Sequence, residues 1–127
     1  MKIKTVACDF DNTLTQGDFY PIIKGINTEA VSVLAELQKR GGKVILFTAR
    51  EQQQLVFALA ALKDSGFVPD YVNDNTPHDI RKYKNNCRKI MSDIYIDDRC
   101  IDYTGDWAKY RKILIDDNPV SPFARRN

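Results

Sequence analysis

The segment Ile3–Phe10 is rich in β-branched and apolar residues, and its end carries two carboxylates one residue apart, Asp9 and Asp11. Such a run predicts a strand that is covered on both faces, which is the environment of strands in parallel sheets. Asn12 and Thr13 follow with the chemistry of a turn, so both acids leave the end of the strand together. Like charges at this separation repel unless a cation or a shared proton lies between them. The segment therefore predicts a buried strand that delivers ligands to a Mg²⁺ site.

The rest of the chain alternates apolar runs with segments of helical periodicity, which is the pattern of a parallel α/β sheet. Behind a cap at Asn27 or Thr28, apolar residues recur at helical spacing until Gly41-Gly42. The fold class that we expect is a Rossmann-like three-layer α/β/α sandwich with a mainly parallel sheet. Strands are expected at 3–10, 44–47, 70–72, 94–96 and 113–115, and the other helices at 51–64, 77–88 and 102–110.

Composition limits the class of protein. A chain of 127 residues with 43% hydrophobic and 28% charged residues is typical of one globular domain. We expect a catalytic core over 1–117 and an irregular tail over 118–127. No apolar run approaches the roughly 18 residues of a membrane span and no signal peptide is evident, so a cytoplasmic protein without membrane contact is predicted. The scattered Cys8, Cys87 and Cys100 fit reduced thiols. A net charge of +2 does not by itself predict binding to nucleic acid.

Three of the expected strands end in polar side chains. Asp9 and Asp11 follow the first strand, Thr48 follows the second, and Asp97 and Asp98 follow the run at 94–96. The carboxyl ends of parallel strands share one edge of the sheet, and ligands of such sheets bind in the crevice outside that edge. We therefore expect these side chains to form one site.

These residues resemble the four motifs of the haloacid dehalogenase-like superfamily. The motifs are a strand followed by D-x-D-x-T, a Thr or Ser at a strand end, a Lys, and an acidic pair at a strand end. The chain shows Asp9–Thr13, Thr48, Lys89 and the pair Asp97-Asp98 in that order. The resemblance covers nearly the whole chain up to the last expected strand.

The resemblance implies a catalytic role for each acid. Asp9 would be the nucleophile that attacks phosphorus and forms an aspartyl-phosphate, which water then hydrolyses. Asp98 is the first choice as direct ligand of Mg²⁺ beside Asp9, and Asp97 is the alternative. Asp11 would give its backbone carbonyl to the metal and its carboxyl group as a general acid for a poor leaving group. Similar ATPases and dehalogenases lack this second acid, so its presence favours phosphomonoester chemistry.

Other residues are expected to bind the phosphate. By resemblance, Thr48 would donate a hydrogen bond to a phosphoryl oxygen, and Lys89 would neutralise its charge, with Lys84 as the alternative lysine. Asn12 and Arg50 lie beside motif residues and are candidates for substrate contact. For Arg50 the other interpretation is an ion pair with Glu51 or an aspartate.

No segment is long enough for the cap domain that larger members of the superfamily carry. The phosphorylated substrate is expected to be a small molecule or a macromolecule. An open site suits a large substrate, such as a nucleic-acid end or a phosphoprotein, or a lid supplied by another subunit of a homo-oligomer. The expected function is that of a capless, Mg²⁺-dependent phosphomonoester phosphatase. Asp97-Asp98-Arg99 also resembles the ending seen in polynucleotide 3′-phosphatase domains, which makes a nucleic-acid end an alternative substrate. The remaining alternatives are phosphotransfer to an acceptor other than water and a non-catalytic module that binds phosphate or Mg²⁺.

Overall fold

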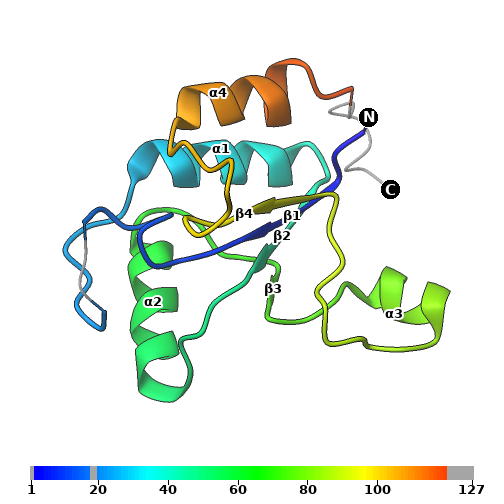
Figure 1. Cartoon of the computed structure of the whole chain (residues 1–127), viewed down its shortest axis with the longest axis horizontal. Helices are drawn as coiled ribbons and strands as arrows, with labels where there is room; N and C mark the ends of the chain where they lie inside the picture. Colours follow the sequence, from blue (N-terminus) through cyan, green and yellow to red (C-terminus); the bar gives the residue numbers. More distant parts are fainter. Residues whose placement is uncertain (1, 18–19, 120–127) are drawn as a thin grey trace.

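A sheet of four parallel strands forms the centre of the computed structural model, which describes residues 2–17 and 20–119 (Figure 1). The strands are β1 (Thr5–Cys8), β2 (Lys43–Leu46), β3 (Tyr71–Val72) and β4 (Ile94–Ile96), and their order across the sheet is β3-β2-β1-β4. The helices are α1 (Thr28–Lys39), α2 (Gln52–Asp64), α3 (Pro77–Tyr83) and α4 (Trp107–Arg111), and α4 continues into a π-helical segment, η1 (Lys112–Asp116). The predicted α/β fold with a parallel sheet is confirmed.

The strand order places the end of β1 in the middle of the sheet. Cys8 at the end of β1 pairs with Leu46 of β2 on one side and with Ile96 of β4 on the other. The residues that follow these three strands therefore leave the sheet at the same edge. In the described residues no further domain is inserted between these elements.

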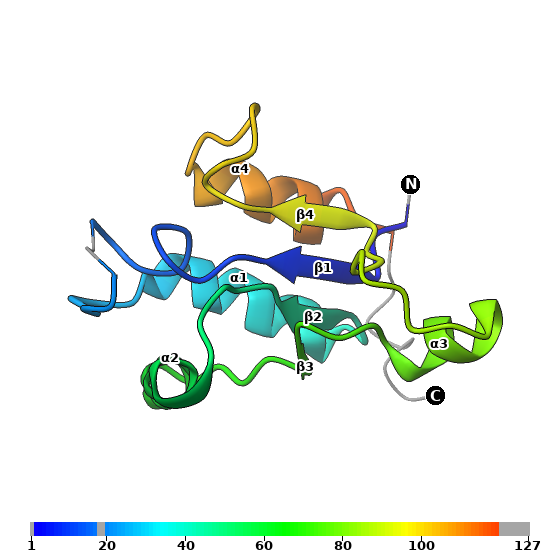
Figure 2. The same ribbon diagram turned by 60° about the horizontal axis from the view of Figure 1, so that its bottom comes forward.

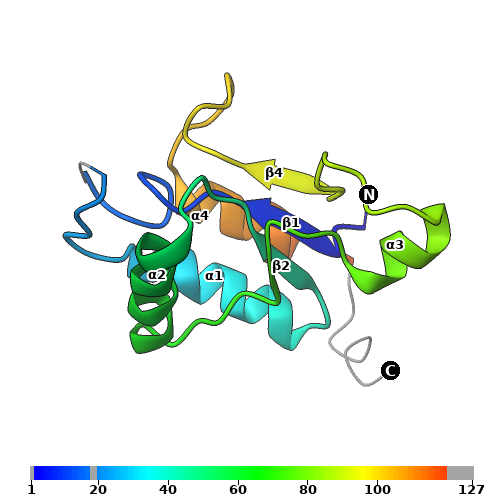
Figure 3. The same ribbon diagram turned by 90° about the horizontal axis from the view of Figure 1, so that it is seen from below.

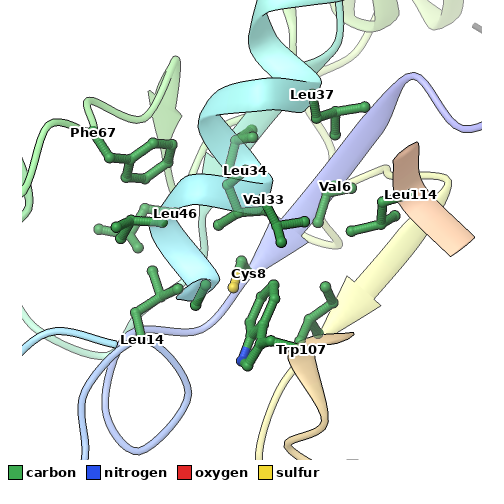
Figure 4. Packing of buried hydrophobic residues seen from close by; sticks show 14 of the residues in the cluster. Val6, Cys8, Leu14, Val33, Leu34, Leu37, Leu46, Phe67, Trp107 and Leu114 are labelled. Carbon is green, nitrogen blue, oxygen red and sulfur yellow. The ribbon is translucent and has the colours of Figure 1, made fainter. Parts of the chain in front are cut away.

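One face of the sheet carries the main hydrophobic core. Alternate residues of β1 and β2 point to this face, where they meet α1 and α4, as Figure 4 shows for Val6, Cys8, Leu34, Leu46 and Trp107. Helix α1 begins where predicted, because the Asn27 side chain accepts a hydrogen bond of 3.1 Å from the Ala30 N–H. Its buried residues are Ala30, Val31, Val33, Leu34 and Leu37.

The other face of the sheet has a thinner cover. Its buried residues are Ala7, Ile45 and Ile90, and Ile90 comes from the segment between α3 and β4. Helix α3 buries no residue, and it lies beyond the end of the sheet from which β1 and β4 begin (Figure 2, Figure 3). The third layer is therefore a short segment, and α3 is remote from the edge at which the strands end.

Two predicted helices are shorter than expected. The helix from Pro77 ends at Tyr83 instead of continuing towards Arg88, because Lys84 adopts a left-handed conformation with φ of 56°. The helix expected from Asp102 begins only at Trp107. The chain before Trp107 forms a turn whose backbone N–H groups donate to the Tyr110 hydroxyl.

The last predicted strand is wrong. Residues 113–115 lie in the π-helical segment η1, where the neighbours Leu114 and Ile115 are both 1% exposed and Ile113 is 41% exposed. Leu114 and Ile115 belong to the main hydrophobic core, where this helical turn packs against α1. An apolar run of three residues does not distinguish these cases in a sequence.

The start of the predicted tail is attached to the sheet. Asn118 is buried, and its side chain accepts a hydrogen bond from the Ile3 N–H and donates to the carbonyls of Ile3 and Leu114. The rest of the predicted tail, from 120 onwards, lies outside the described residues. None of the described helices has the length and apolar character needed to cross a bilayer.

Candidate active site

Three carboxylates lie together at the edge where β1 and β4 end. Asp9 follows β1 and its backbone N–H donates to the Ile96 carbonyl at 2.8 Å, which holds it beside the end of β4. Asp97 and Asp98 follow β4 directly, and one carboxylate oxygen from each of the three acids lies within 4.8 Å of the others. We refer to Asp9, Asp97 and Asp98 as the acid cluster. Their oxygens are hard ligands of the kind that Mg²⁺ prefers, so the residues fit the predicted metal.

Thr13 joins the two strand ends that carry these acids. Its hydroxyl donates to Asp9 Oδ2 at 3.1 Å and accepts from the Asp98 backbone N–H at 3.1 Å. The side chain is buried, at 1% exposure. The sequence pattern included Thr13 as a motif position but predicted no role for it. The structure shows that Thr13 orients Asp9 and ties the β1 turn to the chain after β4.

The acid cluster concentrates negative charge in a partly buried place. Burial, followed by the nearby charge of Asp97 and a hydrogen bond with the Asp98 carboxyl group, raises the pKa of Asp9 to about 7, while the hydrogen bond from Thr13 acts in the opposite direction. A cation placed among the three carboxylates would offset the same repulsion. The cluster could therefore hold a cation.

Asp11 lies outside this cluster and is paired with Arg50. Arg50 Nε donates to Asp11 Oδ2 at 2.9 Å, and Arg50 Nη2 donates to Asp11 Oδ1 at 2.7 Å. This two-pronged pair is the strongest geometry that an arginine and a carboxylate form. Of the two interpretations of Arg50 in the sequence, the structure supports pairing with an aspartate. The backbone-carbonyl contribution of Asp11 to a metal stays a prediction.

Thr48 occupies the end of β2 as expected. Its backbone N–H donates to Asn73 Oδ1 at 2.8 Å, and Asn73 Nδ2 donates back to the Thr48 carbonyl at 2.7 Å. The Thr48 hydroxyl oxygen accepts from the Arg50 N–H at 3.0 Å. A hydroxyl that accepts one bond keeps its own hydrogen to donate. Asn73, at the end of β3, thus positions Thr48, a role that follows from the parallel direction of β3.

A cavity of about 620 Å³ opens over this edge of the sheet. Of the eight residues predicted to form the site, Asp9, Asp11, Asn12, Thr48, Asp97 and Asp98 line it, and Arg50 lies beneath it, against Asp11. Its aromatic walls are Tyr20 and Phe47, which are 59% and 40% exposed, and Arg99 also lines it. No sequence motif indicated that these three residues belong to the site.

The predicted lysines do not line the cavity. Lys89 is exposed, and its Nζ lies 5.9 Å from the centre of the Tyr95 ring. The alternative, Lys84, follows the end of α3. Arg99 is the basic residue on the cavity wall, and its backbone N–H donates to Asp97 Oδ1 at 3.0 Å. The segment that leads to Lys89 was the least regular part of the sequence, and no periodicity predicted its path.

Comparisons with known proteins agree with the fold. No protein-family model matches the chain and no curated protein does. Among solved structures, the chain is similar to a conserved protein from Bacteroides thetaiotaomicron, with 28% sequence identity and a TM-score of 0.76 over 90% of each chain.

Proposed function

We propose that the chain is a Mg²⁺-dependent phosphomonoester phosphatase of the haloacid dehalogenase-like type. The observation that carries the proposal is the acid cluster, in which Asp9 stands beside Asp97 and Asp98 at the carboxyl edge of a parallel sheet. Such a cluster fits a hard cation, and a cation beside a carboxylate allows that carboxylate to approach a phosphate dianion. Asp11, Thr48 and Asn12 on the same cavity wall support the proposal.

In the first step, an Asp9 carboxylate oxygen attacks phosphorus. A bond forms between Asp9 and phosphorus while the bond from phosphorus to the leaving oxygen breaks, and a proton is delivered to that oxygen. In the second step, water attacks the same phosphorus, the bond to Asp9 breaks, and phosphate leaves. Asp9 with Asp98 or Asp97 would hold Mg²⁺, whose positive charge would offset the repulsion between carboxylate and phosphate.

Asp11 is the residue proposed to deliver the proton. In the structure both of its oxygens accept hydrogen bonds from Arg50. Proton donation therefore requires a second arrangement, in which at least one oxygen has left Arg50 and gained a proton. Donating that proton leaves Asp11 ionised, and accepting a proton from the attacking water in the second step returns it to the acid form.

Thr48 and Arg99 are proposed to bind the phosphoryl group. The Thr48 hydroxyl has a hydrogen to donate, and Arg99 lies on the cavity wall. A charged, planar guanidinium suits phosphate oxygens. For Lys89 to take the charge-neutralising role expected from the sequence, the segment before β4 would have to move. The predicted cytoplasmic location and a lid from a second subunit remain proposals beside this mechanism.

A second candidate substrate is a nucleic-acid 3′ end. The exposed rings of Tyr20 and Phe47 line the same cavity as Arg99 and the acid cluster. Aromatic rings stack on nucleobases and a cation contacts the backbone, which is the chemistry of single-strand binding. A simple sugar phosphate would leave both rings uncovered.

The experiment is phosphate release from a panel of phosphomonoesters, which includes p-nitrophenyl phosphate, sugar phosphates and a 3′-phosphorylated oligonucleotide, with and without Mg²⁺. We expect Mg²⁺-dependent release that Asp9→Asn abolishes. Asp64→Asn is the matched control, because Asp64 is exposed at the end of α2 and does not line the cavity. Preference for the oligonucleotide would select the second substrate. Absence of release from every substrate, with Mg²⁺ still bound, would favour the binding-module alternative.

A further inference from the structure

Arg50 is the one charged side chain that is fully buried among the described residues. The residue is 1% exposed and its side chain 0%. A buried guanidinium is costly unless its charge is paired and its donors are all satisfied. The residues that contact the Arg50 side chain therefore indicate its role.

Each part of the guanidinium meets a different element. Nε and Nη2 bind the Asp11 carboxylate, Nη2 also donates to the Pro21 carbonyl at 3.2 Å, and Nη1 donates to the Gln54 carbonyl at 3.4 Å. The rings of Phe10 and Tyr20 each lie 5.0 Å from the guanidinium carbon. Arg50 thus links the turn after β1, the start of α2 and the chain around Tyr20 and Pro21.

Two of these partners face the cavity although Arg50 does not. The Asp11 side chain is 24% exposed and Tyr20 is 59% exposed, and both line the cavity. The chain between β1 and α1 is also held at its base, where Thr15 and Ile26 form an isolated bridge. Tyr20 and Pro21 lie farther along this chain, where Arg50 donates a hydrogen bond to the Pro21 carbonyl and lies over the Tyr20 ring.

We propose that Arg50 is a positioning residue of the site, which holds the Asp11 carboxylate and the Tyr20-Pro21 segment in place on the cavity wall. The inference rests on the proposed function, because it gives Arg50 an effect on turnover that passes through Asp11. It replaces the expectation that Arg50 contacts the substrate. It also distinguishes Arg50 from Arg99, which reaches the cavity surface itself.

A double-mutant cycle with Asp11 tests this coupling. Arg50→Lys keeps the charge but loses the planar fork, and Arg50→Gln removes the charge. We expect each to lower kcat for an alkyl phosphate at least about tenfold, since small misplacements of a reacting group are costly. In the Asp11→Asn background the same changes should alter kcat by less than about twofold, because residues that act as a unit are not additive.

Leu62→Ala separates positioning from general destabilisation. Leu62 is buried in α2 and does not line the cavity. We expect this variant to lose stability while kcat per folded molecule stays unchanged. If Arg50→Lys and Asp11→Asn lower kcat independently, so that their effects multiply, the positioning role is overturned while the proposed function stands.

Hydrogen exchange provides a readout that does not depend on catalysis. In Arg50→Gln we expect faster exchange in the peptide that contains Tyr20 and Pro21, and no such change in Leu62→Ala. Unchanged exchange in this peptide would overturn the structural half of the proposal. If the wild-type protein hydrolyses no substrate, the proposed function fails, and with it the proposed effect of Arg50 on turnover. The exchange measurement alone then decides whether Arg50 holds the Tyr20-Pro21 segment in place.

Discussion

Two groups of charged side chains lie at the same edge of the sheet and are neutralised differently. In the acid cluster, Asp9, Asp97 and Asp98 face one another, and within the described residues no lysine or arginine forms an ion pair with them. A few residues away, Asp11 is matched by the buried Arg50. The first group has an excess of negative charge that a cation can offset, whereas in the second group the charge of Asp11 is balanced by that of Arg50. The comparison separates the groups proposed to bind metal from the group proposed to move a proton.

After the complete loss of turnover expected for Asp9→Asn, the largest effect is expected at Asp11. Asp11→Asn removes the proposed acid and leaves the acid cluster intact, so it should lower turnover of alkyl phosphates by about 100-fold or more. Turnover of p-nitrophenyl phosphate should change little, because its leaving group needs no proton. Steady-state kinetics on both substrates measure this difference. Equal losses on the two substrates would remove the general-acid role from Asp11.

The next effect concerns metal binding by the acid cluster. Mg²⁺ at 100 times its Kd should stabilise the wild-type fold by about 2.7 kcal/mol, which thermal unfolding measures. Asp98→Asn should lose most of this stabilisation, and Asp11→Asn should retain it. Asp97→Asn decides which acid of the pair binds directly. A stabilisation by Mg²⁺ that survives both Asp97→Asn and Asp98→Asn would place the metal elsewhere.

The raised pKa of Asp9 predicts how the metal-free protein depends on pH. Below pH about 4 the Asp9 carboxyl is protonated in both the folded and the unfolded chain, so it contributes no difference. Between about pH 4 and its folded pKa of about 7, Asp9 is ionised in the unfolded chain but still protonated in the folded one. The free energy of unfolding therefore falls as pH rises through this range. The Tm of Asp9→Asn minus that of wild type should therefore increase from pH 4 to pH 8.

The control for this pH dependence is Asp64→Asn, whose Tm difference from wild type should be nearly flat over the same range. Saturating Mg²⁺ should reduce the pH dependence of the Asp9→Asn difference, because the cation stabilises the ionised form of Asp9. A difference between Asp9→Asn and wild type that is the same at pH 4 and pH 8 would contradict the raised pKa.

The smallest effect is expected at Thr13. Thr13→Val preserves the shape of the side chain but removes both hydrogen bonds, which should cost about 1 kcal/mol of stability and weaken the response to Mg²⁺. Thr15→Val is the matched variant, because Thr15 is buried in the same turn and accepts a hydrogen bond from the Asn12 N–H. It should lose stability but keep the Mg²⁺ response. An equal Mg²⁺ response in both variants would mean that Thr13 does not orient the acids.

The parts of the fold that could be predicted from the sequence are those with a clear pattern of apolar and polar residues. The cores of β1, β2 and β4 are apolar runs that end in polar residues, and the helix after Asn27 has both a cap and a periodic apolar face. Residues 113–115 had no second sequence signal beside their apolar character, and they form a helical turn that packs against α1. Helix α3 ends early because Lys84 adopts a left-handed conformation, which the pattern of charges did not indicate.

The candidate site was predictable where the sheet alone positions the residues. The strand pattern predicted a mainly parallel sheet, and the pairing of β1 with β4 within that sheet brings Asp9, Asp97 and Asp98 together. The pairing of Asp11 with Arg50 spans 39 positions and depends on side-chain directions in two turns, so the sequence left it as one of two alternatives. The aromatic walls at Tyr20 and Phe47 depend on loop paths that no periodicity specifies.

The most direct test of the account is to trap the proposed intermediate on Asp9. Wild-type protein with Mg²⁺ and the best substrate from the panel would be quenched rapidly in acid, digested and examined by mass spectrometry. We predict one phosphoryl group on the peptide that contains Asp9, which disappears when the reaction runs to completion and is absent in Asp9→Asn. Steady turnover with the phosphoryl group on another residue, or unimpaired turnover in Asp9→Asn, would contradict the assignment of Asp9 as the nucleophile.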